Sequence, residues 1–163
     1  MTRAGMSVTF VLLVAGCSPP ERPLVAIGKG PDAEIWALLR TCSDDDPLRE
    51  VELSRYDEKG DAVEPGALGD WSARPSGPIN GEKRVSLFRL PRGWQGEAVS
   101  AVKLASKGEY SMSFTVGPDE VVRYKGVVHF TAADVRSLAP GQWWADGKAM
   151  SRAEFRATAD DAC

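Results

Sequence analysis

The clearest chemistry in this chain lies at Cys17, a thiol that directly follows the two small residues Ala15 and Gly16. An apolar segment, residues 8–14, precedes this pair, and Arg3 adds a positive charge near the start. A positive start, an apolar middle and small residues are the three parts of a secretory signal. Small side chains give a peptidase access to the backbone, so we expect this segment to be removed on export.

The same stretch resembles the lipobox of bacterial lipoprotein precursors. It ends in Leu12-Leu13-Val14-Ala15-Gly16-Cys17 and then turns polar and proline-rich over residues 18–23. In that family the cysteine thiol receives a diacylglyceryl group, and a dedicated peptidase then cuts just before it. The resemblance covers roughly the first 20 residues and implies a signal peptide over residues 1–16 and lipidation of Cys17. The alternative is an ordinary secretory signal in which Cys17 is incidental.

Lipidation of Cys17 implies a location on the extracytoplasmic face of the cell membrane, with the membrane as partner. The apolar segment 8–14 is far shorter than the roughly 20 residues that span a bilayer as a helix. Two acyl chains hold a protein stably at a membrane, because each buried methylene contributes about 0.8 kcal/mol. Residues 17–23 would then act as a tether, which their three prolines keep extended.

The composition is that of one folded domain. Removing residues 1–16 from the 163-residue chain leaves 147, enough to bury a core. The chain is 43% hydrophobic and 26% charged, which is typical of globular rather than disordered proteins. Its formal net charge is −3 and it has no basic stripe, so we expect no nucleic-acid partner. Frequent Ala, Gly, Val and Arg with little Ile add to a resemblance to small actinobacterial lipoproteins.

Two cysteines remain besides Cys17. Cys42 and Cys163 lie 121 positions apart, and in an oxidising compartment such a pair most simply forms a disulfide. The alternative is two free thiols. Two cysteines and one histidine at these spacings form no recognisable metal site, so we expect no metal and no cofactor.

Short β-type segments separated by turn residues recur along most of the chain. The segment Tyr110 to Val116 alternates most clearly, with Tyr, Met, Phe and Val on one face and Ser or Thr on the other. We expect hairpins at 24–42 and 98–116, and a bulge or bend at Gly126 within the strand expected over 121–131. The expected strands are 24–27, 34–42, 50–56, 70–74, 84–90, 98–105, 110–116 and 121–131.

The C-terminal part of the chain changes character. Thr131 and Asp134 fit a helix-start capping box, and so do Ser151 and Glu154. Between them, Asp146-Gly147 is the favoured dipeptide of a two-residue hairpin. These features predict a mainly β fold: an antiparallel β-sandwich over residues 24–163 with two short C-terminal helices.

Candidate catalytic groups have weak support. His129, the sole histidine, sits in an apolar strand segment, where a structural role is the usual one. The acidic run 44–46 lacks the glycine and distal glutamate of a calcium loop, so we interpret it as a solvated turn. Gly28-Lys29-Gly30 lacks the context of a phosphate loop. We therefore expect no catalytic residues.

Trp143 and Trp144 are adjacent, so on a strand they point to opposite faces of the sheet. One of them is expected in the core. The other is either exposed, where it could stack on a sugar ring or meet a protein partner, or covered by the terminal helix.

Together these features predict a non-catalytic binding or structural protein of the cell envelope. One alternative is a glycan- or peptidoglycan-binding module that uses an exposed Trp143 or Trp144. A more distant alternative is a hydrolase with unrecognised carboxylates, since no pair of acidic residues stands out in the sequence.

Overall fold

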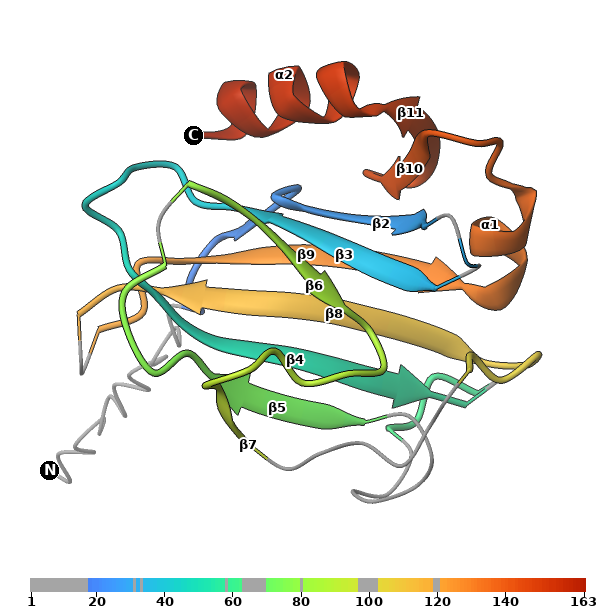
Figure 1. The fold of residues 1–163 in the computed structure, drawn as a ribbon, viewed down its shortest axis with the longest axis horizontal. Coiled ribbons are helices and arrows are strands. Elements are labelled where there is room, and N and C mark those ends of the chain that lie inside the picture. Colours follow the sequence, from blue (N-terminus) through green and yellow to red (C-terminus); the bar gives the residue numbers. More distant parts are fainter. Residues whose placement is uncertain are drawn as a thin grey trace, which may run out of the picture.

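Two β-sheets pack face to face in the computed structural model, with two short helices at the C-terminal end of the chain (Figure 1). The expected β-sandwich is therefore confirmed. The structure describes residues 18–30, 32, 34–57, 59–62, 70–79, 81–96, 103–118 and 121–163. Cys17 lies outside these ranges, as does most of the strand expected over 98–105.

The two sheets differ in size in the described part of the chain. The six-stranded sheet has the order β1 (Glu21–Arg22), β9 (Tyr124–Thr131), β8 (Glu109–Val116), β4 (Leu48–Tyr56), β5 (Trp71–Arg74), β7 (Gln95–Gly96). The five-stranded sheet has the order β11 (Lys148–Ser151), β10 (Gln142–Ala145), β2 (Val25–Lys29), β3 (Ile35–Arg40), β6 (Glu82–Ser86). Neighbouring strands run antiparallel, except that β1 runs parallel to β9.

Alternation along the strands of the larger sheet builds the core. On β8, Met112 and Phe114 are fully buried, and on β4 Val51 and Leu53 are as well, as their spacing predicts. The second sheet contributes β2 and the interior strand β3, whose residues Ala37, Leu38 and Leu39 are buried on both faces because α2 (Arg152–Ala162) covers the outer one. This two-sided burial explains why the β3 sequence is an unbroken apolar run.

Two expected strand features are wrong. The partners of β8 are β4 and β9, and the described residues 103–105 of its expected hairpin arm form no strand. The strand expected over 84–90 ends at Ser86, because the chain turns at Leu87 and Phe88 and brings Arg89 into an antiparallel bridge with Ser86. The indole N–H of Trp71 binds the carbonyl of Leu87 at 2.8 Å and fixes this turn in the core.

Gly126 has a packing role. The β8–β9 register runs past it without a bulge, which corrects that expectation. Gly126 is the cross-strand partner of Phe114, and a Cβ atom here would lie 2.2 Å from the ring. Gly28 behaves in the same way on β2, since a Cβ there would lie 2.7 Å from the indole of Trp143. Both glycines are therefore part of regular strands and leave room for an aromatic ring.

The C-terminal elements form as their local sequence predicts. Thr131 caps α1 (Ala132–Ser137) and Ser151 caps α2, each in a complete capping box. Between the helices, Asp146 (φ 50°) and Gly147 (φ 69°) turn the β10–β11 hairpin. Helix α2 docks through Phe155, which is fully buried.

Ionic contacts hold α2 on the outer face of the smaller sheet. Arg152 and Arg156 both contact the carboxylate of Glu82 on β6, and Arg40 on β3 lies 2.5 Å from Asp160. The hydrogen bond from Arg156, with a further one from Arg152, lowers the pKa of Glu82 from its ordinary 4.5 to about 2. The terminal helix is thus joined to two strands as well as to the core.

Candidate functional site

The chain joins the sandwich almost directly after Cys17. The backbone N–H of Lys125 donates to the carbonyl of Pro20 at 3.0 Å, and Glu21 and Arg22 then pair with β9 as strand β1. Sequence analysis places these two residues in the tether over residues 17–23. Only residues 18–20 therefore separate Cys17 from the first strand.

The expected disulfide is present. Cys42, two residues beyond the end of β3, is bonded to Cys163 at the C-terminal end of α2, with 5.3 Å between the two Cα atoms. Arg22 of the short strand β1 contacts this bridge: its Nη1 donates to Cys42 Sγ at 3.2 Å and to the carbonyl of Cys163 at 3.4 Å. The bridge thus joins the chain just after β3 to the C-terminal end of α2, and Arg22 connects β1 to both cysteines.

Tyr124 completes this junction. Its hydroxyl accepts a hydrogen bond from the backbone N–H of Cys42 at 2.8 Å, and the guanidinium of Arg22 lies 4.8 Å from the centre of its ring. Burial raises the pKa of the Tyr124 hydroxyl above its ordinary value of 10, because desolvation disfavours the charged phenolate. Sequence reasoning missed Arg22 and Tyr124, since nothing in their local pattern marks them as neighbours of a disulfide.

The two candidate stacking residues point to opposite faces of the smaller sheet, as expected. Trp144 pairs with Ile27 and faces the larger sheet, where its indole N–H donates to the carbonyl of His129 at 2.9 Å. Trp143 pairs with Gly28 on the face that α2 covers. Both side chains are half-buried and pack against the core.

His129 and the acidic run lie apart from each other. The His129 side chain is 56% exposed, with Nδ1 3.4 Å from a carboxylate oxygen of Glu109. It lines a hollow of about 290 Å³ together with Asp146.

In the run 44–46 the first two carboxylates are exposed, whereas Asp46 is buried and lies 2.6 Å from Arg123. Asp46 therefore differs from the solvated turn that we expected.

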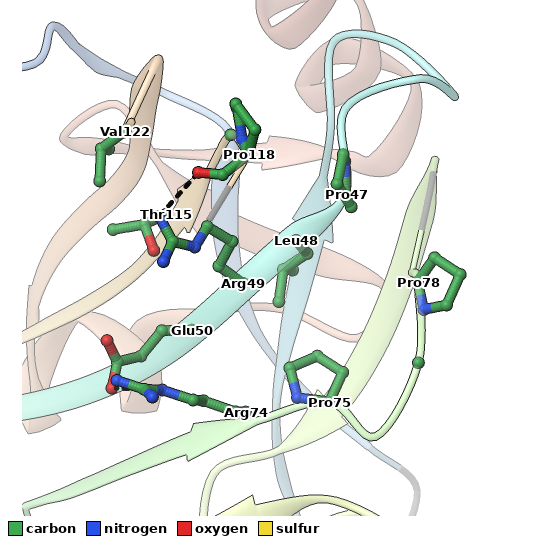
Figure 2. A pocket seen from close by; sticks show the side chains of 12 residues that line it. Pro47, Leu48, Arg49, Glu50, Arg74, Pro75, Pro78, Thr115, Pro118 and Val122 are labelled. Atoms are coloured by element: carbon green, nitrogen blue, oxygen red, sulfur yellow. Dashed lines mark hydrogen bonds and ion pairs between the residues drawn. The ribbon is translucent and has the colours of Figure 1, made fainter. Parts of the chain in front are cut away.

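A larger cleft of about 640 Å³ lies at the end of the sandwich where the chain enters from the tether (Figure 2). This volume lies within the usual range for small-molecule sites. Strand β4 begins in the cleft, β5 and β8 end there, and Val122 adds an apolar side chain before β9. The lining includes four prolines: Pro47, Pro75, Pro78 and Pro118.

Charged groups cross the floor of this cleft. The Nε of Arg74 lies 3.6 Å from a carboxylate oxygen of Glu50, and Arg74 is 72% exposed. Arg49 donates from Nη1 to the carbonyl of Pro118 at 3.0 Å, a bond drawn in Figure 2. Glu50 is the single acidic residue among the described residues that line the cleft. The arrangement is suited to holding a ligand with apolar and anionic parts by guanidinium contacts.

The cleft has no sequence signature. Its lining comes from segments that are far apart along the chain and meet only because β4, β5 and β8 are neighbours. Within the described ranges, no three His, Cys, Asp or Glu side chains gather as metal ligands would. No helix in those same ranges is long and apolar enough to cross a membrane.

Comparisons with known proteins add no relationship. No protein-family model, curated protein or solved structure matches this chain.

Proposed function

We propose that this chain is a lipoprotein, anchored through a diacylglyceryl group on Cys17 at the extracytoplasmic face of the cell membrane. The observation that carries the proposal is the Cys42–Cys163 disulfide. Disulfides form and persist in oxidising compartments outside the cytosol, and the lipobox-like sequence around Cys17 supplies a route to such a compartment.

The sandwich itself acts, in this proposal, as a binding or structural module of the cell envelope rather than as an enzyme. The cleft supports a binding role, because it has the volume of a ligand site and presents the exposed guanidinium of Arg74. A hydrolase of the glycosidase type would need two carboxyl groups facing one site. Glu50 has no acidic partner among the described residues of the cleft, so the hydrolase alternative has less support.

Glycan stacking on Trp143 or Trp144 is the second candidate. The half-burial of both rings and the bond from Trp144 to His129 speak against a free stacking face. Binding of the purified protein to cell-wall fractions that survives replacement of both tryptophans by alanine would exclude this candidate.

The anchor is tested by comparing the full chain with its Cys17→Ala variant in a bacterial host. We expect the wild-type protein to pellet with membranes and to be released by detergent, and the variant to remain in the soluble extracytoplasmic fraction. A Cys42→Ser/Cys163→Ser variant is the matched control, because it removes two cysteines without touching the anchor. Unchanged membrane attachment of Cys17→Ala would contradict the proposal.

The cleft is tested by capture of envelope components with the wild-type protein and with Arg74→Glu. Arg74 is 72% exposed, so the substitution leaves the core intact. We expect the charge reversal to remove the components that the cleft holds, and Arg136→Glu, an exposed control on α1 beyond the far end of β9, to retain them. Identical capture by both variants and the wild type would exclude the cleft as the binding site.

A further inference from the structure

One end of the sandwich contains both the point where the tether enters and the candidate cleft. Strand β1 runs parallel to β9, so both begin at this end, and β8 ends there because it is antiparallel to β9. Leu48, the first residue of β4, pairs with Val116, the last of β8. We call this the tether end; in Figure 1 it lies on the left.

The tether is short compared with the domain. Between Cys17 and Glu21 the chain reaches at most about 14 Å, even when fully extended. A domain of this size has a radius of gyration of about 14 Å, so a lipid on Cys17 would hold the sandwich within one such radius of the bilayer. The β1–β9 pairing and the contacts of Arg22 with the disulfide keep the start of the chain fixed to the sandwich. A lipidated chain would therefore be held close to the bilayer by a short connection rather than by a long stalk.

An exposed apolar side chain lies at the same end. Val121, in the connection between β8 and β9, is 57% exposed and is the exposed large hydrophobic residue in the part of the chain that the structure describes. Its neighbour Val122 lines the cleft. Exposing one valine to water costs the protein little free energy. Moving that side chain to the level where lipid headgroups meet acyl chains is favourable, because apolar surface is removed from water.

We propose that the tether end lies against the bilayer, with Val121 at the level of the lipid headgroups and the cleft next to the membrane. This proposal rests on lipidation of Cys17. The surface that the tether end contacts is the headgroup layer of a neutral lipid bilayer. Exposed charges of both signs lie at the tether end, with Asp44 and Asp45 just after Cys42 and with Arg74 and Arg123 at the same end, so no single sign of charge selects anionic lipids. The opposite end, where β8 begins, lies roughly 25 Å farther from the membrane along the strand and faces the compartment.

The test places a single environment-sensitive fluorophore on the lipidated full-length protein in phosphatidylcholine vesicles. The labelled variants are Val121→Cys, with Asp45→Cys as a second reporter at the tether end and Ser106→Cys as the control at the far end. All three side chains are exposed, so labelling leaves the core intact. The vesicles carry a lipid with a spin label in its headgroup, which quenches nearby fluorophores.

We expect strong quenching and a blue-shifted emission at position 121, quenching at position 45, and neither effect at position 106. Equal quenching at both ends, or stronger quenching at 106, would overturn the orientation while leaving the anchor intact, provided that the protein floats with the vesicles. Failure to float would show that the anchor itself is absent and would overturn both proposals. Flotation and quenching measured on the same sample therefore distinguish the two failures.

Discussion

The indole N–H of Trp144 donates to the backbone carbonyl of His129 at 2.9 Å and so joins the two sheets. His129 lies on β9 beyond the two residues that pair with β1, where the strand has no further β1 residue beside it. The bond gives that carbonyl a partner from the other sheet. Two residues with candidate chemistry in the sequence therefore meet in a structural contact.

Replacing Trp144 by Phe keeps an aromatic ring but removes this donor together with part of the indole surface. We expect a loss of about 1 kcal/mol in the free energy of unfolding, measured by urea denaturation, since one hydrogen bond is lost. Trp143→Phe is the matched control and should cost less, because its ring can still rest on Gly28. A larger loss in the control than in Trp144→Phe would contradict this assignment.

Gly126→Ala tests the packing of Phe114. The added methyl group would lie 2.2 Å from the ring, so we expect a loss of about 1–3 kcal/mol in unfolding free energy. Gly77→Ala serves as the control, because a Cβ there meets no atom within 4 Å. Replacing Phe114 by the smaller Leu makes room for the methyl group, so the loss of unfolding free energy in the double variant Gly126→Ala/Phe114→Leu should be smaller than the sum of the two single losses. A double loss equal to that sum would argue against a clash.

These two contacts illustrate what the sequence can predict. The alternation of β8, the two capping boxes and the Asp146-Gly147 turn are local features, so they identify their elements correctly. Gly126 is ambiguous, because a glycine inside a strand marks either a bulge or the close approach of another group. The identity of the group at Gly126 depends on the β8–β9 register, which no local pattern encodes.

Strand partners and the cleft show the limit of local reasoning. Pairing of β4 with β8 joins segments about 60 residues apart, and loop-closure entropy makes neighbouring segments the default expectation. The proline-rich sequence 18–23 predicts a tether, yet backbone bonds to β9 make Glu21 and Arg22 a strand. The cleft was not predicted, because it exists only after β4, β5 and β8 have assembled.

The Cys42–Cys163 disulfide should contribute strongly to stability. It closes a span of 121 residues, and the chain-entropy estimate for a loop of about 100 residues is roughly 4.7 kcal/mol before any strain in the folded state is subtracted. We expect a reductant to lower the midpoint of denaturant unfolding of the wild-type protein and to leave the Cys42→Ser/Cys163→Ser variant unchanged. Thiol titration of the denatured, unreduced Cys17→Ala protein provides a direct check. More than trace reactivity would show that the bridge is absent.

Acid should weaken the attachment of α2 through Glu82. Its pKa is lowered to about 2, so its contribution to stability is complete above the ordinary value of 4.5 and is lost as the pH falls towards 2. We expect Glu82→Gln to cost about 1–2 kcal/mol at pH 7, less than the full shift implies because both arginines are half exposed. The difference in unfolding free energy between wild type and variant should shrink between pH 4.5 and 2. A difference that is constant with pH would contradict the role of the charge.

The most direct test of the central claim is the intact mass of the mature protein extracted from membranes with detergent. Lipidation predicts a chain that begins at Cys17 and carries the added mass of a diacylglyceryl group on its thiol, with Cys42 and Cys163 each one hydrogen atom lighter in the disulfide. A mature chain that begins elsewhere, or that begins at Cys17 with an unmodified thiol, would contradict the account.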